Sequence, residues 1–201
     1  MLPLILAFLV IGLTGCVAVG PPAEKVSHKD TVGEDPITKT TNAEPLIPGL
    51  ESLDACPWEA DDLAQTMLTL LNQTRSQARM CGDSDLEAAP PLSLNQQLGL
   101  AAARHSADMA NNNFFRHEGS DGQKAGNRTD AAGYQWSSVA ENIAGGQTDM
   151  VTVIQDWLAS EKHCLNLMRP ELTEAGIACS KRDDTDLKLY WTLVLARPLL
   201  E

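Results

Sequence analysis

The sequence has no cluster of Lys and Arg and carries little positive charge overall. Its 201 residues include 15 Lys and Arg against 27 Asp and Glu, which gives a formal net charge of −12. A nucleic-acid-binding protein needs a basic surface that meets the phosphates, and docking on anionic lipid headgroups needs the same sign of charge. We therefore expect no nucleic-acid partner and no electrostatic attachment to a membrane surface.

Several motifs of catalysis and metal binding are also missing. The chain has no C-x-x-C pair of a cysteine zinc site, no H-E-x-x-H helix of a zinc peptidase and no G-x-S-x-G turn of a serine hydrolase. Ser120 and Ser160 each lie close to a histidine in the sequence, but no oxyanion hole can be identified for either. These absences argue against an enzyme without deciding the matter.

No apolar run is long enough to cross a membrane as a helix. The first 15 residues lack charge, are almost all apolar and lead into Leu13-Thr14-Gly15-Cys16. This run is too short for a transmembrane helix, but it fits the apolar region of a signal peptide. No Lys or Arg precedes the run, so either the true start lies upstream or the export signal is unusually neutral.

The Leu-Thr-Gly-Cys segment resembles a bacterial lipobox, in which the cysteine thiol is acylated and becomes the new N-terminus. We expect residues 1–15 to be a lipoprotein signal peptide, and residues 16–56 to be the lipidated Cys16 with a disordered tether rich in Pro, Thr, Glu, Gly and Asp. Val17, rather than Asp, follows the cysteine, as in outer-membrane sorting of Gram-negative lipoproteins. The expected location is the cell envelope, with the protein anchored in the outer membrane by its N-terminal lipid alone and facing the periplasm or the surface. A simple cleaved signal with an incidental cysteine is the alternative.

Four cysteines remain if Cys16 is lipidated, an even number that suits two disulfides in an oxidising compartment. Three connectivities are possible. We favour Cys81–Cys164 together with Cys56–Cys179, because Cys81 and Cys164 are each expected at a helix end and helix ends stack in a layered domain. A local Cys164–Cys179 bridge is the alternative.

The hydrophobic pattern over residues 57–201 predicts helices first and strands last. Helices are expected over residues 60–81, 94–112, 123–132 and 149–163, with Gly82 ending the first and Ser93 capping the second. Strands are expected over residues 176–180 and 187–196, the latter central because it is rich in Trp, Tyr, Val and Leu. This order favours an α+β domain in which helices pack on a sheet.

Three short segments carry the candidate chemistry. His117 follows two phenylalanines, Glu141 lies in a small apolar segment, and His163 is six residues after Trp157. Two imidazoles and a carboxylate can bind a divalent metal or exchange a proton, which makes these three residues the candidate metal ligands and the candidate catalytic residues. The alternatives are a loop hydrogen bond for His117, a buried salt bridge for Glu141 and a cap of a helix C-terminus for His163.

Two further polar residues are expected to have structural roles. His105 falls on one helical face with Leu98, Ala102 and Met109, which places it in the core with a hydrogen-bond partner. Asn166 is expected to tie the turn after the helix that carries His163.

Six motifs follow one another between about Ala60 and Pro198. They are Leu71-Asn72-Gln73-Thr74-Arg75, His105-Ser106-Ala107-Asp108-Met109-Ala110, Asn113-Phe114-Phe115-x-His117, Ala140-Glu141-Asn142-Ile143-Ala144, Trp157-x-x-Ser160-x-x-His163-x-x-Asn166 and Tyr190-Trp191-Thr192. Taken together and in this order, they resemble the CAP superfamily, the SCP-like extracellular domains, in its bacterial lipoprotein form.

The resemblance implies a three-layer α-β-α sandwich with a cavity lined by His117, Glu141 and His163. Ser160 stands where many eukaryotic relatives carry a second glutamate. The implied site is therefore a His-Glu-His set with open positions, able to take Zn²⁺ or another divalent metal, rather than a complete set of two histidines and two glutamates.

The function expected on this basis is a non-catalytic binding module in the bacterial envelope. Its partner would be an extracellular protein, a lipid or a cell-wall component. The first alternative is a hydrolase, a peptidase or a cell-wall-cutting enzyme, that uses the same cavity. The second is a structural surface protein in which the polar cluster only specifies the core.

Overall fold

The computed structural model describes Cys56 and residues 58–199. The predicted signal peptide, Cys16 and nearly all of the predicted tether lie outside the described residues. The helices and strands are α1 (Ala60–Arg75), β1 (Arg79–Cys81), β2 (Ser84–Leu86), β3 (Ser93–Leu94), α2 (Gln96–Asn111), α3 (Ala125–Ala131), β4 (Trp136–Gly145), α4 (Met150–Ala159), α5 (Glu161–Met168), β5 (Glu174–Lys181) and β6 (Leu189–Pro198). None of these helices combines the length and the apolar character that a membrane span requires.

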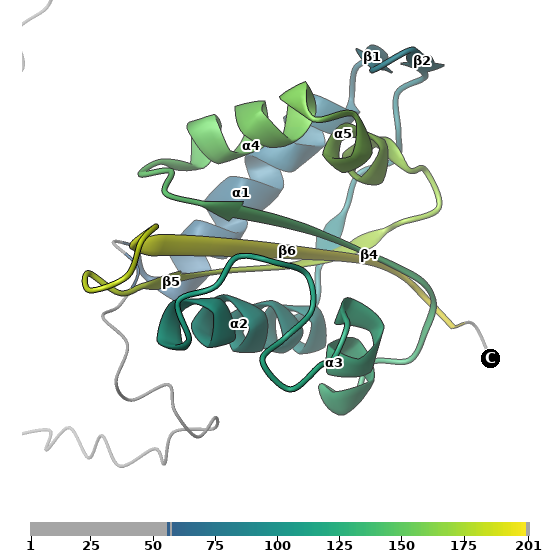
Figure 1. The fold of residues 1–201 in the computed structure, drawn as a ribbon. Coiled ribbons are helices and arrows are strands. Elements are labelled where there is room, and N and C mark those ends of the chain that lie inside the picture. Colours follow the sequence, from purple (N-terminus) through teal and green to yellow (C-terminus); the bar gives the residue numbers. More distant parts are fainter. Residues whose placement is uncertain (1–55, 57, 200–201) are drawn as a thin grey trace, which may run out of the picture. The chain divides into compact units, whose positions relative to one another are not determined.

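A four-stranded sheet of order β3-β5-β6-β4 forms the middle layer. The β3–β5 pair is parallel, and the β5–β6 and β6–β4 pairs are antiparallel. Helices α1, α4 and α5 cover one face of the sheet, and α2 and α3 cover the other (Figure 1). This arrangement confirms the predicted α+β fold with three layers, α-β-α.

Strand β6 is central, as predicted from its composition. Residues Leu189–Ala196 are all buried, because β4 and β5 flank the strand and helices cover both of its faces. On the face under α1 and α4, Trp157 and Trp191 belong to the largest apolar cluster, and each indole N–H donates to a backbone carbonyl. One edge of the sheet is β4, and the other is the part of β5 beyond Ala175 that β3 does not cover.

The first helix is shorter than predicted. It ends at Arg75, and residues Arg79–Cys81 and Ser84–Leu86 form a small antiparallel hairpin instead. Gly82 has φ +60° and serves the hairpin turn, so its predicted role as a helix stop was wrong. Ser93 lies in β3, and the N-cap of α2 is Asn95, whose side chain accepts two backbone N–H groups.

Both favoured disulfides, Cys56–Cys179 and Cys81–Cys164, are present, with Cα–Cα distances of 5.8 and 5.5 Å. The local Cys164–Cys179 bridge is excluded. The reason we gave was wrong, however, because Cys81 lies in the hairpin and Cys164 lies inside α5. Cys56 is bonded to β5, so a fragment that begins at residue 57 would lose this bridge.

The helix predicted over residues 149–163 is two helices. Ser160 has φ −94° and ψ 118°, an extended conformation that breaks the helix between α4 and α5. His163 is consequently in the first turn of α5, which excludes the alternative that it caps a helix C-terminus. Asn166 lies within α5 and not in a turn after it.

Arg75 is fully buried at the end of α1. Its guanidinium donates to backbone carbonyls, those of Pro90, Leu167, Arg169 and Leu172. Burial lowers the pKa of Arg75, and the nearby Glu171 opposes that shift. A single buried cation thus links α1 to the segments that follow the hairpin and α5.

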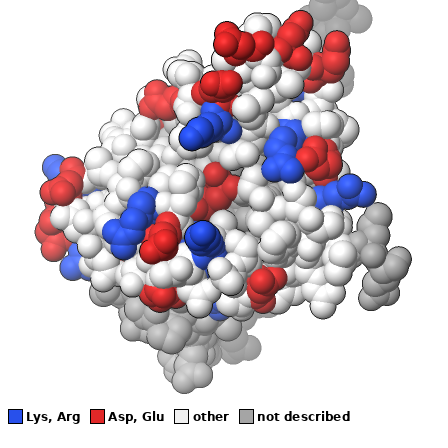
Figure 2. All heavy atoms as spheres, turned by 45° about the vertical axis from the view of Figure 1, so that its right-hand side comes forward, with Lys and Arg blue, Asp and Glu red and all other residues white. Residues whose placement is uncertain are grey.

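Surface charge is mixed on the face that Figure 2 shows. Lys and Arg side chains are scattered among Asp and Glu side chains there. On the described residues of this face no continuous basic area is visible.

Candidate functional site

The candidate site lies at the β4 edge of the sheet, where the loop after α2 meets α3 and α5. Glu141 is in β4, opposite Val194 of β6, and Val194 packs in the apolar cluster under α2. Because side chains alternate along a strand, Glu141 faces the α2–α3 layer and Asn142 faces the α4–α5 layer. The carboxylate of Glu141 is only 3% exposed.

Both oxygens of the Glu141 carboxylate are engaged. Nδ1 of His117 lies 2.9 Å from Oε1, and an Arg128 guanidinium nitrogen lies 2.6 Å from Oε2. Nε2 of His105 lies 3.7 Å from Oε1 on the buried side. Glu141 is therefore the centre of a group of two imidazoles and one guanidinium.

Glu141 is ionised at neutral pH. Burial alone would raise the pKa of Glu141, but the hydrogen bond from His117, together with the charge and the hydrogen bond of Arg128, holds that pKa below its usual range. The salt-bridge alternative for Glu141 is thus realised in Arg128. An ionised carboxylate with both oxygens engaged accepts hydrogen bonds and orients its partners, and it has little capacity left to take a proton.

His117 is the accessible member of the group, with 55% of its side chain exposed. Because the carboxylate accepts, Nδ1 of His117 is the protonated nitrogen, and in the neutral ring the lone pair is on Nε2. The backbone of this loop is also fixed, since Arg128 donates to the carbonyls of His117 and Gln123 at 3.1 and 2.7 Å. Glu141 and Arg128 together set the position and the tautomer of His117.

His163 approaches from the opposite layer. Its ring centroid is 6.4 Å from that of His117. Burial and the neighbouring His117 lower the pKa of His163, which keeps its imidazole neutral at pH 7. Asn142 donates to the carbonyl of His163 at 3.1 Å and accepts from Asn166 at 2.9 Å, so an amide pair fixes α5 on β4.

His105 is fully buried with a hydrogen-bond partner, as predicted, but it also borders the site. Its Nε2 lies 3.0 Å from the carbonyl of Arg116, which can only accept, so Nε2 carries the proton. Nδ1 has no partner among the described residues. Burial lowers the pKa of His105, although Glu141 opposes the shift, and the ring is a neutral spacer between the core and Glu141.

The residues present fit a metal site with two histidine ligands better than a site in which protein side chains supply every ligand. Zinc–nitrogen bonds are about 2.0–2.1 Å long, and imidazole centroids 6.4 Å apart are near enough for one ion to lie between His117 and His163. Glu141 would support His117 from behind, as a carboxylate commonly supports a metal-bound histidine. Within residues 58–199 no group of three or more His, Cys, Asp or Glu side chains surrounds a common point for a metal ion.

The two serines near histidines are held by other groups. The Ser120 hydroxyl donates to Asp108 at 2.6 Å, and Ser160 forms the break between α4 and α5. Neither arrangement is that of a nucleophile bonded to a histidine base.

Sequence reasoning did not find Arg128 or the role of Asn142. Arg128 lies in a polar helix with no local sign that its charge would be buried. Asn142 had a signal, because a residue next to Glu141 in a strand must point to the other face.

The chain is similar to known proteins over most of the layered domain. The family model of the cysteine-rich secretory protein family, CAP, matches residues 68–195. An uncharacterized protein of Bacillus subtilis, YkwD, is 23% identical over 156 residues, which are 78% of this chain and 56% of that protein. The chain thus spans little more than half the length of this relative.

Two solved structures are similar to this domain. An extracellular protein with an SCP domain from Bacillus anthracis is 29% identical with a TM-score of 0.57, over 69% of this chain and 41% of that one. An outer surface protein from Borrelia burgdorferi is 15% identical with a TM-score of 0.55, over 69% of this chain and 92% of that one, and shares the fold. With the family match over residues 68–195 and the layered fold, the chain belongs to the CAP, or cysteine-rich secretory protein, family.

Proposed function

We propose that the chain is a lipid-anchored binding module of the cell envelope, in which His117 and His163 form a divalent-metal site that tunes the loops around it. The observation that carries the proposal is the state of Glu141, which is buried and engaged through both oxygens. The groups left to meet a ligand are then the imidazoles of His117 and His163, and among the described residues no serine or cysteine nucleophile is bonded to either ring. Without a nucleophile bonded to either histidine, the pair favours ligand binding over covalent catalysis.

The envelope location is supported by two independent features. Leu13-Thr14-Gly15-Cys16 has the pattern of a lipidation site. The names of the similar structures describe an extracellular protein and an outer surface protein. We propose lipidation at Cys16 and attachment to the outer membrane, with the domain facing the periplasm or the surface.

The metal site is tested by thermal unfolding of the full chain in detergent, with Zn²⁺, Mg²⁺, Ca²⁺ or a chelator. Zinc at one hundred times its dissociation constant stabilises a native protein by about 2.7 kcal/mol. We expect a zinc-dependent rise of the midpoint in the wild type that is lost in both His117→Ala and His163→Ala. Lys162→Ala is the matched control, because Lys162 is exposed beside His163 and should respond as the wild type does.

A midpoint that zinc leaves unchanged in the wild type would overturn the metal site. The hydrolase alternative has its own test, which is release of soluble fragments from purified cell wall or from casein. We expect no release above a blank. Release that is lost in Glu141→Gln, with the unfolding midpoint retained, would replace the binding module by an enzyme.

A further inference from the structure

The opposite edge of the sheet, β5, is open over much of its length. Strand β3 covers only its beginning, because Ser93–Leu94 pair with Glu174–Ala175 and the chain then turns at Asn95 into α2. The carbonyl of Ala175 accepts the Asn95 N–H at 2.9 Å, so the polar backbone groups of Ala175 face this edge. Backbone groups alternate along a strand, which places those of Ile177 and Cys179 on the same side. Within the described chain no strand pairs with this stretch.

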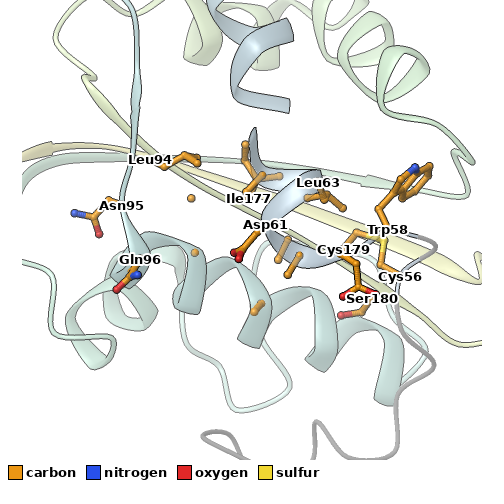
Figure 3. A pocket seen from close by; sticks show the side chains of 17 residues that line it. Cys56, Trp58, Asp61, Leu63, Leu94, Asn95, Gln96, Ile177, Cys179 and Ser180 are labelled. Carbon is orange, nitrogen blue, oxygen red and sulfur yellow. A yellow bond between two sulfur atoms is a disulfide. The ribbon is translucent and has the colours of Figure 1, made fainter. Parts of the chain in front are cut away.

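This open edge forms part of a trench of about 560 Å³ between α1 and α2. Figure 3 shows Leu94, Asn95 and Gln96 at one end of the trench, and Trp58 with the Cys56–Cys179 disulfide at the other. The lining is mainly apolar, and its charged side chains are Glu59 and Asp61, both acidic and exposed. Leu94 lies at the rim of the trench, and it is one of the few large apolar residues of the described chain that are exposed, at 40%.

Gly99 keeps the trench wide on its α2 side. It lies inside α2 and lines the trench, although a glycine in a helix interior is less favourable than alanine by about 1 kcal/mol. A Cβ at Gly99 would meet no atom within 4 Å. Packing within the described chain therefore does not require a glycine, and the space above it opens into the trench.

We propose that this trench binds an extended peptide segment of a partner protein, which adds as a strand to β5 beside Ile177 and Cys179. The segment would carry small or aliphatic side chains, and a Lys or Arg over Glu59 and Asp61. Strand addition satisfies the backbone donors and acceptors of an open edge, while pockets on either side select alternate side chains. A fatty acyl chain would fill the same walls but would leave those donors and acceptors unpaired.

Charge favours a partner peptide over two other possible occupants, the chain's own segment before Cys56 and a second copy of the chain. The residues just before Cys56 include Glu51 and Asp54, which would meet the acidic Glu59 and Asp61 with like charge. A second copy of the chain brings a formal net charge of −12. Like charges disfavour wrong partners, so a basic segment suits this rim best. The inference rests on the proposed role as a binding module but not on metal at His117 and His163.

The test is selection of a displayed library of random ten-residue peptides on the full chain in detergent, with removal of peptides that also bind Gly99→Leu. The leucine side chain would plug the trench. We expect enriched peptides to alternate aliphatic residues and to carry Lys or Arg. Their affinity should fall at least tenfold for Leu94→Glu and for Asp61→Lys.

Val151→Glu is the matched control, because Val151 is 50% exposed on α4 and does not line the trench. It should leave the affinity unchanged. Unfolding midpoints of all variants, and an unchanged zinc response in Gly99→Leu, would show that the fold and the histidine site are intact. A failure of this proposal is thereby distinguishable from a failure of the metal site.

A synthetic copy of an enriched peptide, methylated on the backbone nitrogens that would face β5, supplies the second measurement. We expect it not to bind. Equal binding of the methylated peptide, or no enrichment over Gly99→Leu, would overturn the proposal. Tighter peptide binding by Leu53→Asp would assign the trench to the chain's own segment before Cys56, and displacement of the peptide by palmitate would assign it to a lipid.

Discussion

The guanidinium of Arg128 and the carboxylate of Glu141 form a buried ion pair, 2.6 Å apart, between α3 and β4. The same guanidinium fixes the loop carbonyl of His117. One arginine therefore links the edge strand, the short helix and the exposed imidazole. This relationship makes Arg128 a residue that positions the site without facing a ligand.

Replacing Arg128 by Met should destabilise the fold by about 3–5 kcal/mol, because Glu141 would remain as an unpaired buried charge. Urea unfolding measures the loss. The double variant Arg128→Met with Glu141→Leu should recover part of it, since the buried charge is then absent. Arg169→Met is the control, because the Arg169–Glu171 pair is more than a third exposed on both sides and should contribute less than about 1 kcal/mol. Similar losses for Arg128→Met and Arg169→Met would contradict the buried pair.

The stability should fall as the pH falls through about 6.5, the ordinary pKa of histidine. Burial lowers the pKa of His105 and of His163 in the folded protein. The unfolded chain consequently binds more protons than the folded chain just below pH 6.5, and acid favours unfolding. His105→Gln retains a donor for the Arg116 carbonyl and should flatten the decline in unfolding free energy between pH 7 and pH 5. An unchanged slope in this variant would show that His105 titrates normally in the folded protein.

Arg75→Lys should destabilise the protein by about 3 kcal/mol or more, although it keeps the charge. A lysine lacks the planar fork of donors, and each buried carbonyl left without a donor costs about 1–3 kcal/mol. Chemical denaturation of the oxidised protein gives the value. Arg104→Lys is the comparison, because Arg104 makes one hydrogen bond, to the exposed carbonyl of Ala131, and little change is expected.

Two glycines that lie close together should respond in opposite directions. Gly99→Ala should raise the free energy of unfolding by up to about 1 kcal/mol, because the helix gains propensity and the added Cβ has room. Gly176→Ala should lower it, because its Cβ would collide with the backbone of Leu98 and Gly99 in α2. The pair needs only thermal or urea unfolding. A destabilised Gly99→Ala would contradict the open space above α2.

The layered fold was predictable because composition and apolar periodicity extend over whole helices and strands. A nearly continuous apolar run rich in Trp, Tyr, Val and Leu marks the last strand, and an apolar stripe marks each long helix. The errors lie where tertiary contacts decide the local conformation. Residues 76–81 contain neither Gly nor Pro, so the sequence predicts that the helix continues through them. In the structure a turn at Gly82 and the disulfide of Cys81 hold residues 79–86 as a hairpin instead. The break at Ser160 likewise has no local breaker residue.

The candidate site was predictable only in part. His117, Glu141 and His163 come from three elements, and only resemblance to a family could group them before the fold was known. The charged partner of Glu141 could not be deduced, because any of the 15 Lys and Arg residues could have met it. His117 and His163 approach the β4 edge from opposite layers of the sandwich, and no local sequence pattern predicts this arrangement.

The Cys56–Cys179 bridge also determines how tension on the chain's N-terminal side would travel. A pull on the residues before Cys56 passes through the bridge to Cys179 and so to the strand β5. Helix α1, which follows Cys56 in the chain, is spared that load as long as the bridge is intact. Reduction of this one bond would move the load to the first turn of α1, so the mechanical strength of the domain depends on its redox state.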